Sequence, residues 1–253
     1  MGKIIAFANQ KGGVGKSTSA INTAAALGAL GKKTLLCDFD PQGNTTSGVG
    51  INKKAVRTSV YDVLISRCEA AAAVLDTGFR NLFVLPANIT LAGAEFELVE
   101  AENRESRLKS ALDKIKADYD YILIDCPPSL GILTMNALVA SDGIVVPMLC
   151  EYFSLEGLSQ LMITVREIKR RYNPPLELTG LLITMFNGRL NLSQEVLAEL
   201  KKYYGDKLFS AMIPRSVRIS EAPGFGQPIH YYDKFSKGAE AYVEVAKEII
   251  RRS

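Results

Sequence analysis

A loop rich in glycine and lysine near the N-terminus has the composition of a phosphate-binding site. Residues 9–18 read NQKGGVGKST and directly follow an apolar run. The glycines allow the backbone to curl so that successive N–H groups point at one anion, and the helix that follows adds its positive N-terminal end. Lys16 would reach the β- and γ-phosphates of a nucleotide, and the Ser17 hydroxyl would ligate Mg²⁺. The residues predicted to bind a nucleotide here are Lys11, Gly12, Gly13, Val14, Gly15, Lys16, Ser17 and Thr18.

This loop departs from the common phosphate-loop pattern at two positions. In G-x-x-x-x-G-K-[ST] the first glycine would stand where the chain has Gln10, and Lys11 adds a second lysine inside the loop. Two lysines on one loop repel each other unless an anion shields them. A second cation beside a triphosphate would stabilise the charge on the transferring phosphoryl group, and the alternative is a lysine that only contacts solvent.

Aspartates follow two further apolar runs. The stretch DFDPQGNTTSG begins with Asp38 and contains Asp40, and YILIDCPPS places Asp125 at the end of its run. In phosphoryl transfer an acidic residue commonly holds the metal's water shell, and another polar residue orients the attacking water. We assign the first task to Asp125 and the second to Asp40, so the predicted metal site comprises Ser17, Asp40 and, through water, Asp125. Asp38 either contacts the ligands of this metal, without binding the metal itself, or caps a turn.

The elements that must position these residues follow from the hydrophobic pattern. Near-continuous apolar runs predict buried strands at Ile4–Ala8, Thr34–Cys37, Leu82–Leu85, Tyr121–Cys126, Ile144–Met148, Leu178–Thr184 and Phe209–Ile213. Apolar residues three and four apart predict helices at Ser17–Leu30, Arg107–Lys116, Leu155–Tyr172, Ser193–Tyr204 and Gly238–Arg252. We therefore expect an α/β fold with a mostly parallel, twisted sheet and helices on both faces, whose ligands collect beyond the carboxyl ends of the strands.

Composition limits the class of protein. The chain has 253 residues, 47% hydrophobic and 23% charged, without a recognisable linker, so we expect one folded domain over residues 1–253. A net charge of +3 argues against a protein that coats nucleic acid by charge alone. The single histidine excludes a His–His metal pair, and four cysteines without C-x-x-C indicate neither a zinc site nor a disulfide framework. No apolar run is long enough to span a membrane, which favours a cytoplasmic protein.

Five stretches together resemble one known family. They are KGGVGKST, DFDPQGNTTSG, IDCPPSLG, CEYFSLEGL and IPRSVRISEAP. These stretches are similar to the ParA/Soj family of chromosome- and plasmid-partitioning ATPases, which are P-loop NTPases of the deviant Walker A (SIMIBI-like) type. The same group includes the cell-division ATPase MinD and the nitrogenase iron protein. The similarity extends over essentially the whole chain.

The resemblance implies a role for the second lysine. In this family the residue matching Lys11 reaches across a dimer interface to the phosphates of the other subunit's ATP. The residue matching Gly12 packs closely against that subunit. The family's catalytic residues correspond here to Lys11, Lys16 and Asp40.

The resemblance also implies an adenine site. ATP is favoured over GTP, because the guanine-recognition pattern N-K-x-D would need Asp where Ala55 stands. Relatives commonly have Asp at the position of Asn187. The residues that correspond to the family's adenine contacts are Met185, Asn187, Pro214 and Arg215.

Partners follow from the same resemblance. In the Soj-like branch the arginines matching Arg189 and Arg218 bind DNA once an ATP-bound homodimer has formed, and two-fold symmetry doubles the phosphate contacts of a modest basic patch. The first predicted strand begins near the N-terminus and leaves no room for a helix-turn-helix before it, so we expect non-specific binding to double-stranded DNA and association with the nucleoid. A ParB-type centromere-binding protein with a basic N-terminal segment would stimulate hydrolysis.

Two other members of the group define the alternatives. A membrane-cycling ATPase like MinD would need a C-terminal amphipathic anchor. The stretch GAEAYVEVAKEIIRRS has Ala241, Val245 and Ile249 at helical spacing without Phe, Trp or Leu on that face, which favours a helix docked on the core and no stable membrane anchor. A cluster-carrying ATPase like the nitrogenase iron protein would need cysteines at a dimer face, whereas Cys126 and Cys150 end apolar runs and are interpreted as core thiols.

Overall fold

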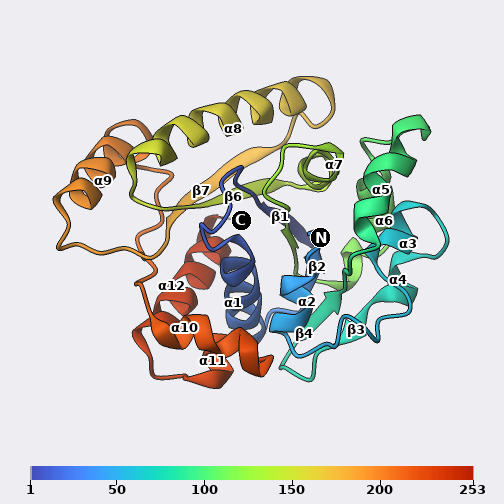
Figure 1. Cartoon of the computed structure of the whole chain (residues 1–253), viewed down its shortest axis with the longest axis horizontal. Coiled ribbons are helices and arrows are strands. Elements are labelled where there is room, and N and C mark those ends of the chain that lie inside the picture. The colour runs from blue at the N-terminus through green and yellow to red at the C-terminus, as the bar shows by residue number, and fades with distance from the viewer. Residues whose placement is uncertain (1, 253) are drawn as a thin grey trace.

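In the computed structural model, which describes residues 2–252, a seven-stranded sheet with strand order β3-β4-β2-β5-β1-β6-β7 runs through the molecule (Figure 1). The strands are β1 (Lys3–Phe7), β2 (Thr34–Asp38), β3 (Leu75–Asp76), β4 (Leu82–Leu85), β5 (Tyr121–Asp125), β6 (Gly143–Met148) and β7 (Glu177–Ile183). Neighbouring strands pair in parallel, apart from β3, which is antiparallel to β4.

Helices cover both faces of this sheet. The α-helices are α1 (Lys16–Ala29), α2 (Asn44–Gly48), α3 (Val60–Leu64), α4 (Ala70–Ala73), α5 (Leu91–Glu97), α6 (Arg107–Asp113), α7 (Ile132–Ala140), α8 (Tyr152–Arg171), α9 (Asn191–Tyr204), α10 (Val217–Glu221), α11 (Ile229–Tyr232) and α12 (Lys237–Arg252). Three short 3-10 helices are η1 (Leu98–Glu100), η2 (Lys116–Asp118) and η3 (Ala222–Phe225). Helices α1 and α12 pack against each other on one face, and α6, α7 and α8 cover the other (Figure 1). The predicted α/β fold class is confirmed.

Side chains of alternate residues in each central strand point to opposite faces of the sheet. Ile4 and Ala6 of β1 belong to the core under α6, α7 and α8, whereas Ile5 and Phe7 belong to the core under α1 and α12. All four side chains are fully buried. Because the sheet is covered on both faces, its strands read as continuous apolar runs in the sequence.

One predicted strand is wrong. Residues 209–213 run beside β7, where the Phe209 and Ile213 amides donate to carbonyls of that strand at 3.0 and 2.9 Å, but they form no strand. Between those two contacts the Ser210 amide donates to the Glu248 carboxylate of α12 at 3.0 Å. A parallel ladder uses every second amide of a strand, so after Phe209 the Ala211 amide should donate to the Ile183 carbonyl. Ile213 donates there instead, and the two extra residues interrupt the ladder. The seventh strand is instead β3, whose two residues are too few to give a period.

The helices differ from their predictions mainly at boundaries. The predicted helix 107–116 ends at Asp113 and is followed by η2, and α8 begins at Tyr152, three residues before the predicted start. Helix α7 reads ILTMNALVA and is almost entirely buried, so it has no polar face from which a helical period could be recognised. Among residues 2–252 no helix is long and apolar enough to cross a membrane.

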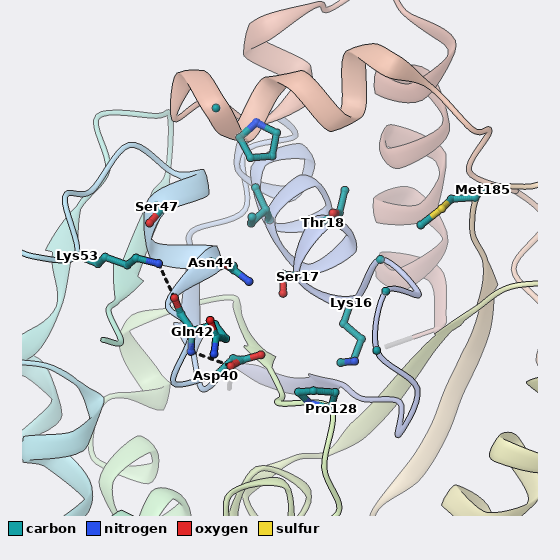
Figure 2. A pocket seen from close by; sticks show the side chains of 16 residues that line it. Lys16, Ser17, Thr18, Asp40, Gln42, Asn44, Ser47, Lys53, Pro128 and Met185 are labelled. Atoms are coloured by element: carbon teal, nitrogen blue, oxygen red, sulfur yellow. Dashed lines mark hydrogen bonds between the residues drawn. The ribbon is translucent and has the colours of Figure 1, made fainter. Parts of the chain in front are cut away.

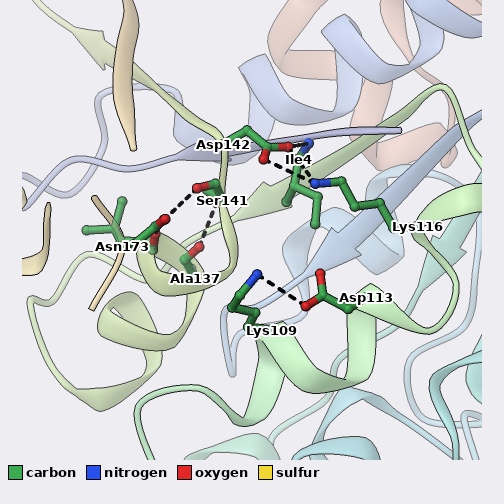
Figure 3. A network of polar contacts seen from close by, with 9 residues as sticks. Ile4, Lys109, Asp113, Lys116, Ala137, Ser141, Asp142 and Asn173 are labelled. Carbon is green, nitrogen blue, oxygen red and sulfur yellow. Dashed lines mark hydrogen bonds and ion pairs between the residues drawn. The ribbon is translucent and has the colours of Figure 1, made fainter. Parts of the chain in front are cut away.

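Polar contacts close the amino edge of the sheet (Figure 3). Asp142, which precedes β6, accepts a hydrogen bond from the Ile4 amide of β1 at 2.8 Å and pairs with Lys116 at 2.9 Å. The Asn173 side-chain amide donates to the carbonyls of Leu138 and Ser141 at 2.9 and 2.7 Å. These polar groups satisfy one another's hydrogen-bonding capacity at the amino ends of the strands. The predicted site residues lie at the opposite, carboxyl ends.

Candidate nucleotide-binding site

The loop between β1 and α1 has the backbone expected for phosphate binding. Gly13 and Gly15 adopt φ values of 72° and 80°, which residues with side chains rarely adopt. Gly15 is the N-cap of α1, and no side chain caps that helix, so its first N–H groups point toward the loop. Val14 is buried, and its carbonyl accepts a hydrogen bond from the Thr184 hydroxyl, just after β7, at 2.8 Å. The loop is therefore fixed at a helix N-terminus that favours anions.

A cavity of about 650 Å³ opens above this loop (Figure 2). Its volume lies in the range of small-molecule sites. The predicted residues that line this cavity are Gly12, Gly13, Gly15, Lys16, Ser17, Thr18, Asp40 and Met185. The phosphate loop and the aspartate that follows β2 thus line one cavity, although 21 residues separate Thr18 from Asp40 in the sequence.

A second cavity of about 350 Å³ adjoins the first and shares Met185 with it. Pro214 and Arg215 also line this second cavity, so three of the four residues predicted at the adenine face one space beside the phosphate loop. Asn187 lines neither of these two cavities, and its side-chain oxygen accepts a hydrogen bond from the Arg189 amide at 3.1 Å. The structure therefore does not bring Asn187 to the same wall.

The two lysines of the loop point in different directions. Lys16 is 7% exposed, and its amine donates to the Lys11 carbonyl at 3.0 Å. Desolvation lowers the pKa of Lys16, an effect that nearby negative charge, above all that of Asp125, opposes. Lys11 instead extends toward α8, where its amine pairs with the Glu151 carboxylate at 2.5 Å and both side chains are partly exposed. Lys16 therefore faces the cavity, whereas Lys11 is held outside it.

Two buried carboxyl groups lie side by side at the carboxyl edge of the sheet, because Asp38 of β2 and Asp125 of β5 are register partners. Burial raises the pKa of Asp38 to about 6 and the pKa of Asp125 to about 7. Asp38 accepts hydrogen bonds from the Thr46 amide and hydroxyl at 2.7 and 2.6 Å, and Asp125 accepts one from the Thr45 hydroxyl at 2.6 Å. A cation at this edge would favour the ionised form of both groups.

The Asp125 carboxyl group fits a site for Mg²⁺. Its Oδ1 atom is buried and has no hydrogen-bond partner among the residues that the structure describes. Buried polar atoms without a partner are rare, because each raises the free energy of the folded state. Burial and the charge of Asp38 dominate the raised pKa of Asp125, and the Thr45 and Ser17 hydroxyls oppose them. An oxygen of this kind near the Ser17 hydroxyl is suited to a magnesium ion with its water shell.

Asp40 lies on a turn that leads into α2. It is 7% exposed, its Oδ1 atom accepts a hydrogen bond from the Gln42 amide at 2.9 Å, and its carbonyl accepts one from the Gly43 amide at 2.9 Å. Gly43 ends the turn with a φ of 61°. The Asp40 carboxylate is therefore presented to the cavity from a defined turn.

Several residues that hold this site together are not predicted from the sequence. Thr45 and Thr46 lie in α2, within the stretch DFDPQGNTTSG, and their hydroxyls donate to Asp125 and Asp38. Two adjacent hydroxyls a few residues after the aspartates are the signal that could have identified them. Glu151 is 140 residues from Lys11, and no local pattern predicts that pair. Lys53 lines the cavity from the loop after α2, also without a local signal.

The two arginines predicted to bind DNA lie on adjoining segments. Arg189 is exposed on the loop between β7 and α9. Arg218 belongs to α10, has a side chain 60% exposed and pairs with Glu221 at 3.4 Å. A backbone hydrogen bond of 2.9 Å from Phe186 to Ile213 joins the two segments. Both arginines thus follow stretches of chain that line the second cavity.

Comparison with known proteins agrees with this geometry. A family described as an AAA domain matches residues 2–178. The chain is 54% identical over 249 residues to the sporulation initiation inhibitor protein Soj of Bacillus subtilis, with 98% of each chain covered. It is 48% identical over 252 residues to the chromosome partitioning protein ParA of Myxococcus xanthus, covering 100% of this chain and 89% of that protein.

A solved structure extends the comparison to the fold and its ligands. It is described as cobyrinic acid a,c-diamide synthase from Mycobacterium smegmatis with a bound ATP analog and magnesium. It superposes with a TM-score of 0.87 at 38% identity, covering 99% of this chain and 95% of that one. The two relatives of higher identity are both named for sporulation or chromosome partitioning. With the phosphate loop, its second lysine and the aspartates at the sheet edge in place, the chain belongs to the ParA/Soj family of partitioning ATPases.

Proposed function

We propose that this chain hydrolyses ATP with Mg²⁺, dimerises around ATP, and as a dimer binds double-stranded DNA without sequence preference, in order to segregate a chromosome or plasmid with a ParB-type partner. The names of its relatives support the partitioning role. One sheet with a core on each face supports a single ATPase domain over residues 1–253. We place the protein in the cytoplasm, associated with the nucleoid.

The nucleotide would occupy the two adjoining cavities. The N–H groups of the loop and of the first turn of α1 would bind the phosphates, and Lys16 would neutralise charge on the β- and γ-phosphates. Met185, Pro214 and Arg215 line the space into which the base would extend. The relative solved with an ATP analog and magnesium supports this choice of ligand.

Hydrolysis would depend on the acidic residues at the sheet edge. Ser17 and, through water, Asp125 would hold Mg²⁺, with Asp40 near the same metal. When bound, Mg²⁺ supplies positive charge that stabilises the phosphate oxygens. Asp40 would accept a hydrogen bond from the attacking water and orient it toward the γ-phosphate. The Gln42 amide already fixes the Asp40 carboxylate, so little reorganisation would be needed.

The observation that carries the dimer proposal is the direction of Lys11. Its amine lies outside the cavity of its own subunit, on the Glu151 carboxylate. A partly exposed pair of this kind contributes about 0–1 kcal/mol, so the triphosphate of a second subunit would displace Glu151 readily. Lys11 would then stabilise charge on the transferring phosphoryl group in trans, as the family resemblance implies.

Surfaces near Lys11 are consistent with a second subunit. Tyr152 and Phe153, directly after Glu151, are 71% and 70% exposed, and exposed aromatic pairs commonly mark interaction sites. A Cβ atom added at Gly12 would meet no atom of this subunit within 4 Å. Gly12→Val is therefore expected to leave the fold and ATP binding intact while blocking close contact with a partner subunit.

DNA binding would use the arginines beside the base cavity. Arg189 is exposed, and Arg218 would exchange its contacts with Glu221 at 3.4 Å and Asp233 at 3.8 Å for a DNA phosphate, which a guanidinium can bind through two parallel hydrogen bonds. A dimer presents two copies of this modest patch, and affinity for DNA rises steeply with the number of phosphates neutralised. Dimerisation alone would thus make DNA binding depend on ATP.

Co-sedimentation with DNA tests the proposal. The wild-type protein and the variants Asp40→Ala, Lys16→Ala and Gly12→Val are incubated with ATP, ADP or no nucleotide across a salt series. We expect ATP-dependent, salt-sensitive retention of the wild type and persistent retention of Asp40→Ala as a dimer. Lys16→Ala should fail to bind ATP, and Gly12→Val should bind ATP as a monomer. An Asp40→Ala protein that stays monomeric and off DNA with ATP would contradict the proposal.

A parallel assay with anionic liposomes addresses the MinD-like alternative. Helix α12 packs Tyr242, Val245 and Ile249 into the core beneath α1, so this apolar face is already covered. Cys126 and Cys150 are buried, as predicted for core thiols. We therefore expect no ATP-dependent retention on liposomes, and retention on liposomes but not on DNA would favour the membrane-cycling alternative.

A further inference from the structure

We infer that Lys53 is a positioning residue that holds Asp40 in place for hydrolysis, an inference that rests on the ATPase activity within the proposed function. Lys53 lies on the loop that follows α2 and is partly buried. It lines the cavity of about 650 Å³ across from Lys16 (Figure 2).

Two hydrogen bonds connect Lys53 with Asp40 through one residue. The Lys53 amine donates to the Gln42 carbonyl at 2.6 Å, and the Gln42 amide donates to Asp40 Oδ1 at 2.9 Å, as the dashed lines in Figure 2 show. Both bonds involve the main chain of Gln42. Fixing its carbonyl therefore restricts rotation of the residue whose amide holds the Asp40 carboxylate.

The aliphatic part of Lys53 adds a steric contact to the same turn. A Cβ atom added at Gly43 would lie 3.0 Å from Lys53 Cδ and 2.9 Å from the Ala87 carbonyl oxygen. The Lys53 side chain thus lies directly against the Gly43 backbone, with the Ala87 backbone also close by. The amine and the aliphatic part of one side chain both restrain the turn that carries Asp40.

Lys53 restrains the turn before α2 through contacts separate from those that hold α2 itself. On the sheet side, Thr46 binds Asp38 and Thr45 binds Asp125, and these buried bonds hold α2. Loss of the Lys53 amine would leave those bonds intact and release only the turn before α2. We therefore expect a slower hydrolytic step without loss of the fold or of ATP affinity, because Lys53 acts through Asp40 and not on the phosphates.

Three variants separate this role from a general effect of charge. Lys53→Met retains most of the aliphatic chain and removes the amine, and Lys53→Arg restores a donor. Lys54→Met is the matched control, because it removes the same charge from the neighbouring exposed residue of the same loop. Single-turnover ATP hydrolysis and the ATP dissociation constant are measured for each. We expect about a tenfold lower rate for Lys53→Met with the dissociation constant within about twofold of wild type, partial rescue in Lys53→Arg, and wild-type behaviour in Lys54→Met.

A measurement without nucleotide provides a second readout. Amide hydrogen exchange at residues 40–44 should be about fivefold or more faster in Lys53→Met than in Lys54→Met, since the bonds that restrain the turn are weakened. Equal rates of hydrolysis in these two variants would overturn the inference, and so would a loss of ATP affinity as large as the loss of rate. Equal amide exchange in the two variants would show that Lys53 does not restrain the turn. If instead the wild type bound ATP without hydrolysing it, the proposed function itself would fail.

Discussion

Asp142 lies at the amino ends of the strands and Asp125 at their carboxyl ends, and the two side chains differ in almost every contact. Asp142, at the amino edge, accepts a hydrogen bond from the Ile4 amide and pairs with Lys116. Asp125, at the carboxyl edge, is fully buried, has a pKa raised to about 7 by burial, and carries an oxygen without a partner among residues 2–252. The first arrangement stabilises the fold, whereas the second leaves binding capacity for a ligand.

The comparison shows how to separate structural from functional acids in one sheet. A structural carboxylate has its donors within the chain, so its removal lowers the free energy of unfolding. A functional carboxylate lacks a full set of donors, so its removal affects ligand chemistry and has little effect on the fold. Substitutions at the two edges should therefore have opposite consequences.

The largest effect is expected for Asp125→Asn. The variant retains an acceptor for the Thr45 hydroxyl but loses the negative charge that would hold the metal's water shell. We expect Mg²⁺-dependent ATP hydrolysis to fall at least about 100-fold, with the free energy of unfolding within about 1 kcal/mol of wild type. Hydrolysis assays and urea titration measure the two quantities. Normal hydrolysis, or an unfolded variant, would remove the distinction between the two edges.

Asp142→Ala should show the converse pattern. It leaves the Ile4 amide and the Lys116 amine without their acceptor, which should lower the free energy of unfolding by about 2–3 kcal/mol while ATP affinity stays unchanged. Asp113→Ala is the control, because its pair with Lys109 is a half-exposed i,i+4 contact (Figure 3) worth at most about 0.5 kcal/mol. Equal destabilisation by the two variants in urea titration would show that Asp142 has no special structural role.

The two buried aspartates should also make the stability of the protein depend on pH. The folded-state pKa values of Asp38 and Asp125 are raised to about 6 and about 7, so the protonated forms favour the folded state. Their contribution is fully present below the unfolded value of 3.8 and is lost as pH rises through 6 and 7. Without nucleotide we expect the free energy of unfolding to be on the order of 2 kcal/mol higher at pH 5 than at pH 7.5. Because other groups also titrate, the informative measurement is the difference between wild type and Asp125→Asn, which should have the shallower dependence.

The smallest effect is expected at the proposed DNA surface. Arg218→Ala should weaken DNA binding by the ATP-bound protein about three- to tenfold and reduce its salt dependence, because each dimer loses two phosphate contacts. ATP affinity should not change. Arg171→Ala removes a similarly exposed arginine at the far end of α8 and serves as the control. Equal DNA affinity of the two variants, measured by fluorescence anisotropy, would argue against a specific role of Arg218.

Much of the site was predictable because its geometry is local. A buried strand, a glycine-rich loop and a helix follow one another from Lys3 to Ala29, so the loop sequence alone determines where its N–H groups point. Asp38 and Asp125 end apolar runs, and parallel strands bring such ends to one edge. Predicting these features requires only the order of the strands, loops and helices along the chain.

The remaining contacts depend on how distant segments pack. The pair between Lys11 and Glu151, and the contact of Lys53 with Gln42, follow from the placement of α8 and of the loop after α2 on the finished fold. Residues 209–213 have the composition of a strand, but two extra residues between the Phe209 and Ile213 bonds to β7 interrupt the ladder. An interruption of this kind leaves no signal in the hydrophobic period of the sequence.

The pairing of Asp38 with Asp125 also limits where residues can be inserted into this chain or deleted from it. Cys37 and Ile124 face one core while Leu36 and Leu123 face the other, so each aspartate reaches the α1 side by the alternation of its strand. Inserting or deleting one residue within β2 or β5 would turn one carboxylate to the opposite face of the sheet. Insertions in this region should therefore be tolerated in the surface loops between strands and helices but not within these two strands, even where every residue of the site is retained.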